Sequence, residues 1–276
     1  MSGQFTLTPE ELDEFHRRGV VCLAGLFSHD TVRRAREYVQ LRLSSIGLWK
    51  RGAWCLTSAP RPSWPATGLK PSKVIGNRHP DVEALLQEPA LLAAVDALLD
   101  GADTEHTVSK RPQILFTLPN SDAWIVPHGW HVDLPRLASG RSTGVQVFAF
   151  LDTVEPRGGG TLVITGSHRL LNDGRARQAK DIKQLLCQEA FFRELYAEAP
   201  ATGADRARLL GETAIVDDVE LQVVELTGAP GDAYLMDLRV LHTAAPNAAD
   251  HPRIMATHRF VRVAVMQELT ETLAWE

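Results

Sequence analysis

Cysteine is scarce in this sequence, and long apolar runs are absent. Its three cysteines, Cys22, Cys55 and Cys187, are odd in number and widely spaced, so they form neither a disulfide framework nor a Cys-x-x-Cys metal site. Reduced thiols and a cytoplasmic protein are therefore expected. No apolar stretch approaches the length needed to cross a bilayer, and the first residues contain neither an apolar signal core nor a cationic leader.

An excess of positive charge is also lacking. The net charge is −5, acidic and basic residues are interspersed, and the chain has no basic stripe or basic amphipathic helix. These properties argue against nucleic acid or a membrane surface as a partner. With 44% apolar and 23% charged residues, the chain has the composition of a globular protein. Because it has no repeats, low-complexity tracts or linker, residues 1–276 are expected to form a single domain.

Helical signals are concentrated in the N-terminal third of the chain. Helices are expected at residues 8–19, 28–45 and 81–99. The first has Thr8 at its N-cap and Glu11 completing a capping box, Ser28 caps the second, and Pro89 interrupts the third. This part of the chain should therefore form a helical flank at about residues 8–101.

A strand pattern replaces the helical one from about residue 106. Strands are expected near residues 107–118, 124–133, 144–152, 160–165, 220–226, 232–237, 240–243 and 253–263. A short β-rich run also lies at residues 19–23, and a polar, helix-favouring insertion occupies residues 170–212. Helices followed by roughly eight strands favour a mainly β fold, with a cupin-like jelly-roll core at about residues 106–263 and a helical N-terminal part.

Residues 47–78 show no clear period and are rich in tryptophan and proline. Such a stretch is typical of a long ordered loop or a set of short turns. Two interpretations remain open. The segment is either a packed surface flap or a lid whose aromatic side chains line a substrate pocket.

The first candidate for chemistry is the pair His131 and Asp133. If the segment is extended, both side chains point to the same face, because side chains alternate along a strand. An imidazole and a carboxylate can supply two ligands of a facial metal site, and His242 is the candidate for the third. Two histidines and one carboxylate with open positions are the arrangement of non-haem Fe(II) oxygenases.

A glycine cluster at residues 158–160 raises the question of a phosphate-binding loop. No Lys-Ser/Thr pair follows the cluster, and the next segment is an apolar strand, whereas a phosphate loop leads into a helix. A turn that leads into a buried strand fits these residues better.

The motifs together resemble the phytanoyl-CoA dioxygenase family. The resemblance rests on His131-x-Asp133, on the run from Gly159 to His168, and on His242 followed by Pro246-Asn247 and Arg253, and it covers about residues 8–263. It implies a double-stranded β-helix and an enzyme that uses Fe(II), 2-oxoglutarate and O2. It also implies that the iron ligands are His131, Asp133 and His242.

The same resemblance implies the site of the co-substrate. Arg253 matches the arginine that binds the distal carboxylate of 2-oxoglutarate, and a planar guanidinium suits that bidentate pairing. Thr161 and Gln113 match positions near the same co-substrate. The chain departs from the family at Leu118, where a lysine often precedes the proline, so the remaining co-substrate contacts are open. The carboxylate of Asp133 favours oxygenation, since related halogenases carry a small residue there.

The implied reaction is hydroxylation of a C–H bond in a small organic molecule, with release of succinate and CO2. Desaturation, epimerisation or cyclisation at the same iron site is an alternative. A second alternative, from another class, is a non-catalytic jelly-roll module that binds or senses Zn or Ni. Arg253 argues against this module, because simple metal binding does not require a guanidinium. The sequence sets no expectation for the oligomeric state.

Four further residues have two interpretations each. His168 is either a hydrogen-bonding residue that closes its turn or a metal ligand, and the first is favoured. Trp130 either packs in the wall of the fold or stacks on a substrate. Arg136 and Arg239 are either solvated loop charges or contacts to an anionic substrate.

Overall fold

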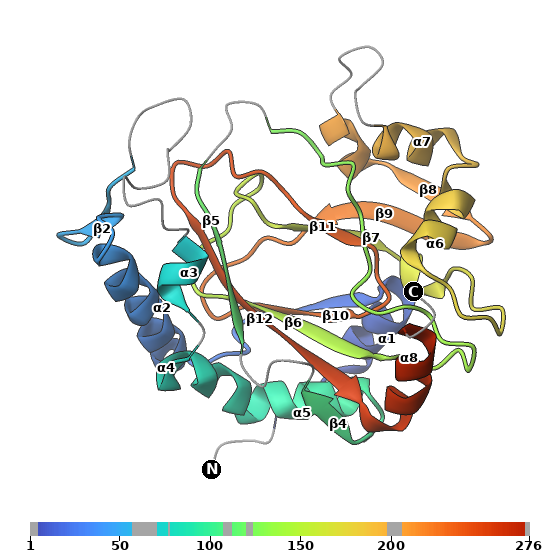
Figure 1. Ribbon diagram of the computed structural model, residues 1–276, viewed down its shortest axis with the longest axis horizontal. Coiled ribbons are helices and arrows are strands. Elements are labelled where there is room, and N and C mark those ends of the chain that lie inside the picture. The colour runs from blue at the N-terminus through green and yellow to red at the C-terminus, as the bar shows by residue number, and fades with distance from the viewer. Residues whose placement is uncertain are drawn as a thin grey trace.

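The computed structural model describes residues 5–56, 71–76, 78–106, 112–119, 124–197 and 206–273 (Figure 1). Two antiparallel sheets form the centre of the described chain. The larger sheet has the order β1 (Val20–Leu23), β10 (Ala233–Asp237), β6 (Gly144–Phe150), β12 (Arg253–Arg262) and β4 (Thr104–His106), and β5 (Gln113–Thr117) also pairs with β12. The smaller sheet has the order β11 (His242–Ala244), β7 (Thr161–Thr165), β9 (Val219–Glu225) and β8 (Thr213–Val216).

The two sheets enclose one apolar cluster. Phe148 and Met255 contribute to it from β6 and β12 of the larger sheet, and Val163 contributes from β7 of the smaller sheet. Because side chains alternate along a strand, the residues next to these point to the outer faces. Arg253 and Arg259 have the same parity as Met255 along β12, so both belong to the inward face.

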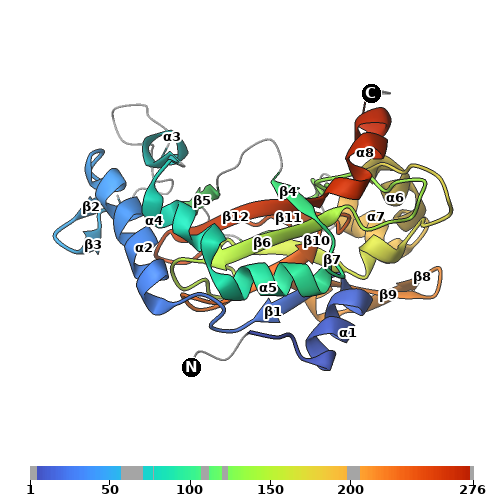
Figure 2. The ribbon, with the colours of Figure 1, turned by 90° about the horizontal axis from the view of Figure 1, so that it is seen from below.

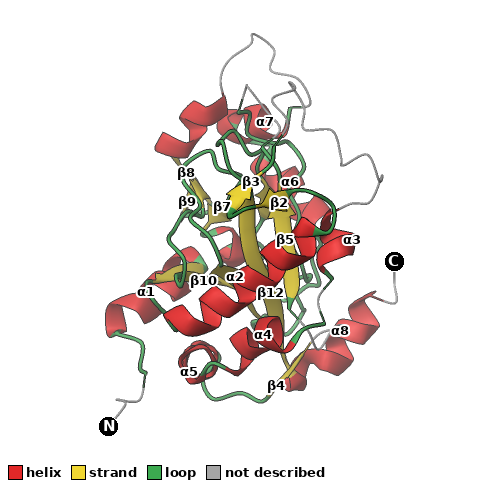
Figure 3. Ribbon diagram, turned by 90° about the vertical axis from the view of Figure 1, so that its left-hand side faces the viewer, coloured by secondary structure: helices red, strands yellow, loops and turns green. Residues whose placement is uncertain are grey.

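Helices from the N-terminal third cover the outer face of the larger sheet. They are α1 (Pro9–Arg18), α2 (His29–Ser44), α3 (Pro71–Ile75), α4 (Pro80–Glu83) and α5 (Pro89–Leu98). Val39 of α2 and Leu91 of α5 are completely buried in one cluster with Val147 and Leu235 of the sheet. Burial of each such side chain contributes about 1.5–3 kcal/mol. Figures 2 and 3 show α2, α4 and α5 together on this side of the sheet.

The smaller sheet has a separate cover. Helices α6 (Ala179–Leu186) and α7 (Ala190–Tyr196) bury Ile182 and Phe192 against Leu162 and Leu221 of β7 and β9. Helix α8 (Met266–Leu273) buries Leu269 in a smaller cluster beside the end of β12. No helix in the described part of the chain is both long and apolar enough to cross a membrane.

The expected fold class, a jelly-roll core with a helical N-terminal part, is confirmed. The capping box of Thr8 and Glu11 is formed, and Ser28 caps α2 through its hydroxyl group. Gly19 ends α1 in the left-handed conformation, with φ of 76°. The segment at 81–99 is divided into α4, a 3-10 turn at Ala84–Gln87 and α5, which begins at Pro89.

One expected strand is wrong. Residues 124–133 form no strand, and His131 makes only an isolated bridge to His242. The apolar residues of this segment are buried as an irregular chain, with Trp124, Val126 and Trp130 packed into the cluster beneath α6 and α7. Tertiary packing, and not sheet pairing, therefore explains the apolar pattern of the segment.

The sequence also gave no signal for several elements. They are the hairpin of β2 (Trp49–Lys50) and β3 (Ala53–Trp54), the short strands β4 and β8, and helix α8. The hairpin and α3 belong to the stretch at 47–78 for which a loop was expected. Residues 57–70 and 77 of that stretch, including Trp64, lie outside the described residues, and the prediction of a flap or a lid falls mainly on them.

Candidate metal centre

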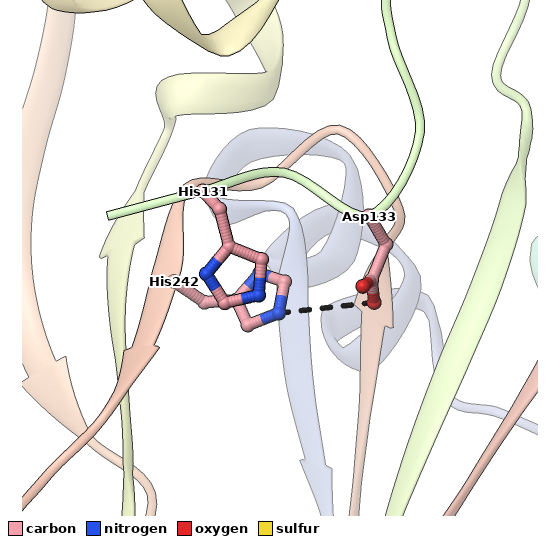
Figure 4. A group of neighbouring side chains, drawn as sticks. All are labelled: His131, Asp133 and His242. Carbon is pink, nitrogen blue, oxygen red and sulfur yellow. Dashed lines mark ion pairs between the residues drawn. The ribbon is translucent and has the colours of Figure 1, made fainter. Parts of the chain in front are cut away.

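His131, Asp133 and His242 come from two distant parts of the sequence, and their side chains lie close together (Figure 4). One possible ligand atom from each of His131, Asp133 and His242 lies within 4.8 Å of the other two. His131 and Asp133 come from the irregular segment that precedes β6, and His242 is the first residue of β11. The structure thus brings together all three residues predicted as metal ligands.

The backbone positions these side chains directly. The N–H of His131 donates to the carbonyl of His242 at 3.0 Å, and the N–H of His242 donates to the carbonyl of His131 at 2.9 Å. His242 also pairs with Val163 of β7, which places its side chain on the inward face. Asp133 follows two residues after His131 and points to the same space (Figure 4).

The ring of His242 is oriented by the chain itself. Its Nδ1 lies 3.1 Å from the carbonyl oxygen of Val240, so Nδ1–H donates to this oxygen and Nε2 keeps its lone pair. Burial lowers the pKa of His242 to about 4, and the ring is therefore neutral near pH 7. A neutral imidazole whose other nitrogen is held by a carbonyl is a preorganised metal ligand.

The two oxygens of Asp133 are in different environments. Oδ1 accepts a hydrogen bond from Nη2 of Arg259 at 2.6 Å. Oδ2 is buried, has no hydrogen-bond partner among the described residues, and lies 3.7 Å from Nε2 of His242. A buried carboxylate oxygen without a partner is costly. A divalent cation bound between Oδ2 and the two imidazoles would satisfy it, so the donor set fits a metal ion.

Two buried arginines hold the irregular segment before and after His131 and Asp133. Arg136 donates from Nε to the carbonyl of Leu170 at 2.6 Å and from Nη2 to the carbonyl of Ser167. Arg206 donates to the carbonyl of Val126 at 3.3 Å and to that of Ala197. The sequence indicated neither contact, because buried guanidiniums that bind main-chain carbonyls leave no local pattern.

The interpretation of Arg136 and Arg239 as solvated loop charges is wrong, whereas a contact to an anionic substrate stays a prediction. Arg136 is 1% exposed, and burial lowers its pKa to about 10. Arg239 is buried beside Asp237, to which it donates from Nε and Nη2 at 2.9 Å each. Although burial opposes ionisation, Arg239 holds the pKa of Asp237 well below its usual range. Both arginines are buried and make hydrogen bonds within the fold.

Arg253 is the first residue of β12 and lies on the inward face of this strand. Its side chain is buried, and Nη2 donates to Oγ1 of Thr117 at 2.5 Å. Burial lowers its pKa to about 10, so the guanidinium remains charged near pH 7. Its Nε has no partner, and it forms no ion pair with any described residue. A buried cation without a carboxylate partner is suited to bind an anionic ligand.

Thr161 and Gln113 also have inward positions. Thr161 is buried on β7 with the parity of Val163, and Gln113 is exposed at the start of β5 with the parity of Thr117. Within the described chain, neither side chain hydrogen-bonds to His131, Asp133 or His242.

His168 and Trp130 take structural positions. The Nε2 of His168 lies 3.1 Å from the carbonyl of His16 near the end of α1, and burial lowers the pKa of His168 to about 4. His168 is not part of the clustered group. Trp130 is buried in the apolar cluster beneath α6 and α7, which supports its interpretation as wall packing.

Comparison with solved structures gives related folds at low sequence identity. AviO1 from Streptomyces viridochromogenes Tue57 is 18% identical with a TM-score of 0.54, and the match covers 94% of this chain and 98% of that chain. The non-heme alpha ketoglutarate dependent carbocyclase SnoK from nogalamycin biosynthesis is 15% identical with a TM-score of 0.56, covering 93% and 85%. HygX from Streptomyces hygroscopicus, solved with nickel and 2-oxoglutarate bound, is 16% identical with a TM-score of 0.52, covering 94% and 88%.

At these identities the structural likeness shows the shared fold. A search of curated protein sequences finds no match. The family model described as phytanoyl-CoA dioxygenase (PhyH) matches residues 15–255, which include the clustered His131, Asp133 and His242 as well as Arg253. The chain therefore belongs to the phytanoyl-CoA dioxygenase family of 2-oxoglutarate-dependent non-haem iron oxygenases.

Proposed function

We propose that residues 1–276 form one catalytic domain that hydroxylates a C–H bond of a small organic molecule, with Fe(II) held by His131, Asp133 and His242. The observation that carries this proposal is the buried, unpartnered Oδ2 of Asp133 beside the free Nε2 of His242. The overall reaction converts 2-oxoglutarate, O2 and the substrate R–H into succinate, CO2 and R–OH. When bound, the iron supplies the activation of O2 that no side chain can provide.

The residues of the chain bind and orient the reactants. Arg253 pairs with the distal carboxylate of 2-oxoglutarate, and the hydroxyl group of Thr117 holds the guanidinium in place. Thr161 and Gln113 are further proposed contacts to this co-substrate, supported by their positions on inward faces. The apolar cluster between the sheets limits the access of water to the site.

The first experiment measures succinate formation from 2-oxoglutarate with Fe(II), ascorbate and O2, followed by a substrate screen based on co-substrate consumption. We predict that His131→Ala and His242→Ala each abolish turnover, because each change removes one metal ligand. His251→Ala is the matched control, since His251 is only partly buried, lies outside the cluster and contacts Asp250. A wild-type protein that forms no succinate, and whose metal spectrum does not respond to 2-oxoglutarate, is instead the metal-binding module.

A second candidate outcome is epimerisation or cyclisation at the same site. It is supported by the similar folds of the epimerase SnoN and the carbocyclase SnoK. Mass spectrometry of the product distinguishes these outcomes, because hydroxylation adds one oxygen atom whereas epimerisation leaves the mass unchanged and oxidative ring closure removes two hydrogens.

A further inference from the structure

Arg259 makes the only hydrogen bond that the described residues give to the side chain of Asp133. Its Nη2 lies 2.6 Å from Oδ1, and the Asp133 side chain is 7% exposed. The other oxygen, Oδ2, is left without a partner on the side of His242. Arg259 therefore occupies Oδ1 of the carboxylate and leaves Oδ2 without a hydrogen bond.

Arg259 is firmly anchored in the larger sheet. It lies on β12, which pairs with β6 on one side and with β4 and β5 on the other, and its partner across β6 is Gln146. Gln146 is buried and donates to the hydroxyl group of Thr257, the next inward residue of β12. The base of the arginine is thus fixed by strand pairing, although its side chain is 34% exposed.

The same face of β12 carries Arg253. The two arginines are six residues apart, which corresponds to about 20 Å along an extended strand. Their environments differ, since Arg253 has a hydroxyl group as its oxygen partner and Arg259 has the carboxylate of Asp133. Arg253 remains available for an anionic ligand, whereas Arg259 is already committed to a candidate metal ligand.

We propose that Arg259 is a positioning residue that limits Asp133 to one metal–oxygen bond. This inference rests on the proposed function. A carboxylate can bind a cation through one oxygen or through both. A charge-assisted hydrogen bond to Oδ1 favours binding through Oδ2 alone. The coordination position that a second oxygen would occupy then stays open for 2-oxoglutarate or O2, as a facial site requires.

A purely electrostatic role for Arg259 makes the opposite prediction. If the arginine only neutralised the buried carboxylate, it would compete with the metal ion and repel it. Its removal would then leave metal affinity unchanged or raise it. For a residue that orients a ligand, removal lowers metal affinity, typically by about 10- to 100-fold. The sign of the change in affinity therefore separates the two roles.

The test is a titration of the full-length protein with Co(II), comparing wild type with Arg259→Met, Arg259→Lys and Arg262→Met. Arg262→Met is the matched control, because it removes an arginine of the same strand that pairs with Asp100, away from the site. We expect Arg259→Met to bind Co(II) about 10- to 100-fold more weakly and Arg262→Met to bind it as wild type does. Arg259→Lys, which keeps a charged donor, should recover part of the affinity.

A second readout follows the coordination of the bound ion. With Oδ1 released, Asp133 binds Co(II) through both oxygens, so the visible spectrum of the Co(II)-loaded Arg259→Met protein changes shape. We also expect the Co(II)-loaded Arg259→Met protein to bind 2-oxoglutarate more weakly than wild type, although Arg253 is intact. Wild-type Co(II) affinity in both Arg259 variants, or tighter binding, overturns the inference and leaves the proposed function standing. A wild-type protein that binds no Co(II) rejects the proposed metal centre itself.

Discussion

Arg253 is a buried cation with only neutral partners, a hydroxyl group and a thioether, among the described residues. If it binds the distal carboxylate of 2-oxoglutarate, Arg253→Ala removes a charge-assisted pair worth about 1.5–3 kcal/mol. The KM for 2-oxoglutarate should rise by about 10- to 100-fold, with a smaller effect on kcat. Succinate formation at varied 2-oxoglutarate gives both constants. An unchanged KM would remove Arg253 from this role, and Thr117→Val should show a smaller increase.

His168 makes the stability of the fold depend on pH. Burial lowers its pKa to about 4 in the folded protein, whereas the unfolded chain titrates near 6.5. Between these values only the unfolded chain takes up the proton, so the free energy of unfolding falls as the pH falls. The loss from this residue between pH 7 and pH 5 is about 2 kcal/mol.

Urea unfolding of wild type and His168→Gln at pH 7 and pH 5 measures this contribution. The glutamine does not titrate, and its amide can donate to the same carbonyl of His16. The variant should lose less stability than wild type over this interval. Equal losses in both proteins would show that His168 does not titrate as its burial implies.

Among single residues, the sequence predicts the metal ligands better than it predicts the residues that hold them in place. His131 and Asp133 share a two-residue spacing, and family motifs point to His242 and Arg253. The contact from Arg259 to Asp133 spans more than a hundred residues and depends on how β12 faces the irregular segment. No local pattern contains that relation. The buried hydrogen bonds of Arg136 and Arg206 are hidden from sequence analysis for the same reason.

At the scale of elements, the junction between α1 and β1 depends on Gly19. Its φ is +76°, and a Cβ there would lie 2.4 Å from Nδ1 of His168 and 2.6 Å from Val240. We therefore predict that Gly19→Ala lowers the free energy of unfolding by about 2–4 kcal/mol, from left-handed strain and overpacking together.

A double-mutant cycle in urea separates these two causes. His168→Ala removes one of the colliding side chains, so Gly19→Ala should cost less in that background than in wild type. Strict additivity of the two changes would contradict the proposed collision and leave backbone strain as the cause.

Secondary structure is predictable here where local chemistry decides it. The caps at Thr8 and Ser28 and the apolar period of β6 mark their elements correctly. The segment at 124–133 has a strand-like apolar pattern, yet it packs as an irregular chain against the helical insertion. Its conformation depends on side chains such as Arg206, which are remote in the sequence.

At the scale of the whole molecule, the metal centre joins two distant parts of the chain. Because the unfolded chain does not hold His131, Asp133 and His242 together, an ion that binds them stabilises only the folded state. A concentration 100 times the Kd adds about 2.7 kcal/mol. Ni(II) should therefore raise the Tm of wild type by about 5 °C or more, and EDTA should reverse the change. Calorimetry of wild type and His242→Ala tests this, and equal shifts in both would place the bound ion elsewhere.

The two main-chain hydrogen bonds between His131 and His242 have a consequence beyond catalysis. Strand β11 is an edge strand of the smaller sheet. On its outer side, the N–H and C=O groups are unpaired wherever no other segment covers them. The segment that carries His131 pairs with this edge at His242, the first residue of β11. Exposed sheet edges are templates for pairing with another chain. Variants that loosen this segment are thus expected to self-associate and form aggregates, so that impaired solubility would accompany the loss of iron.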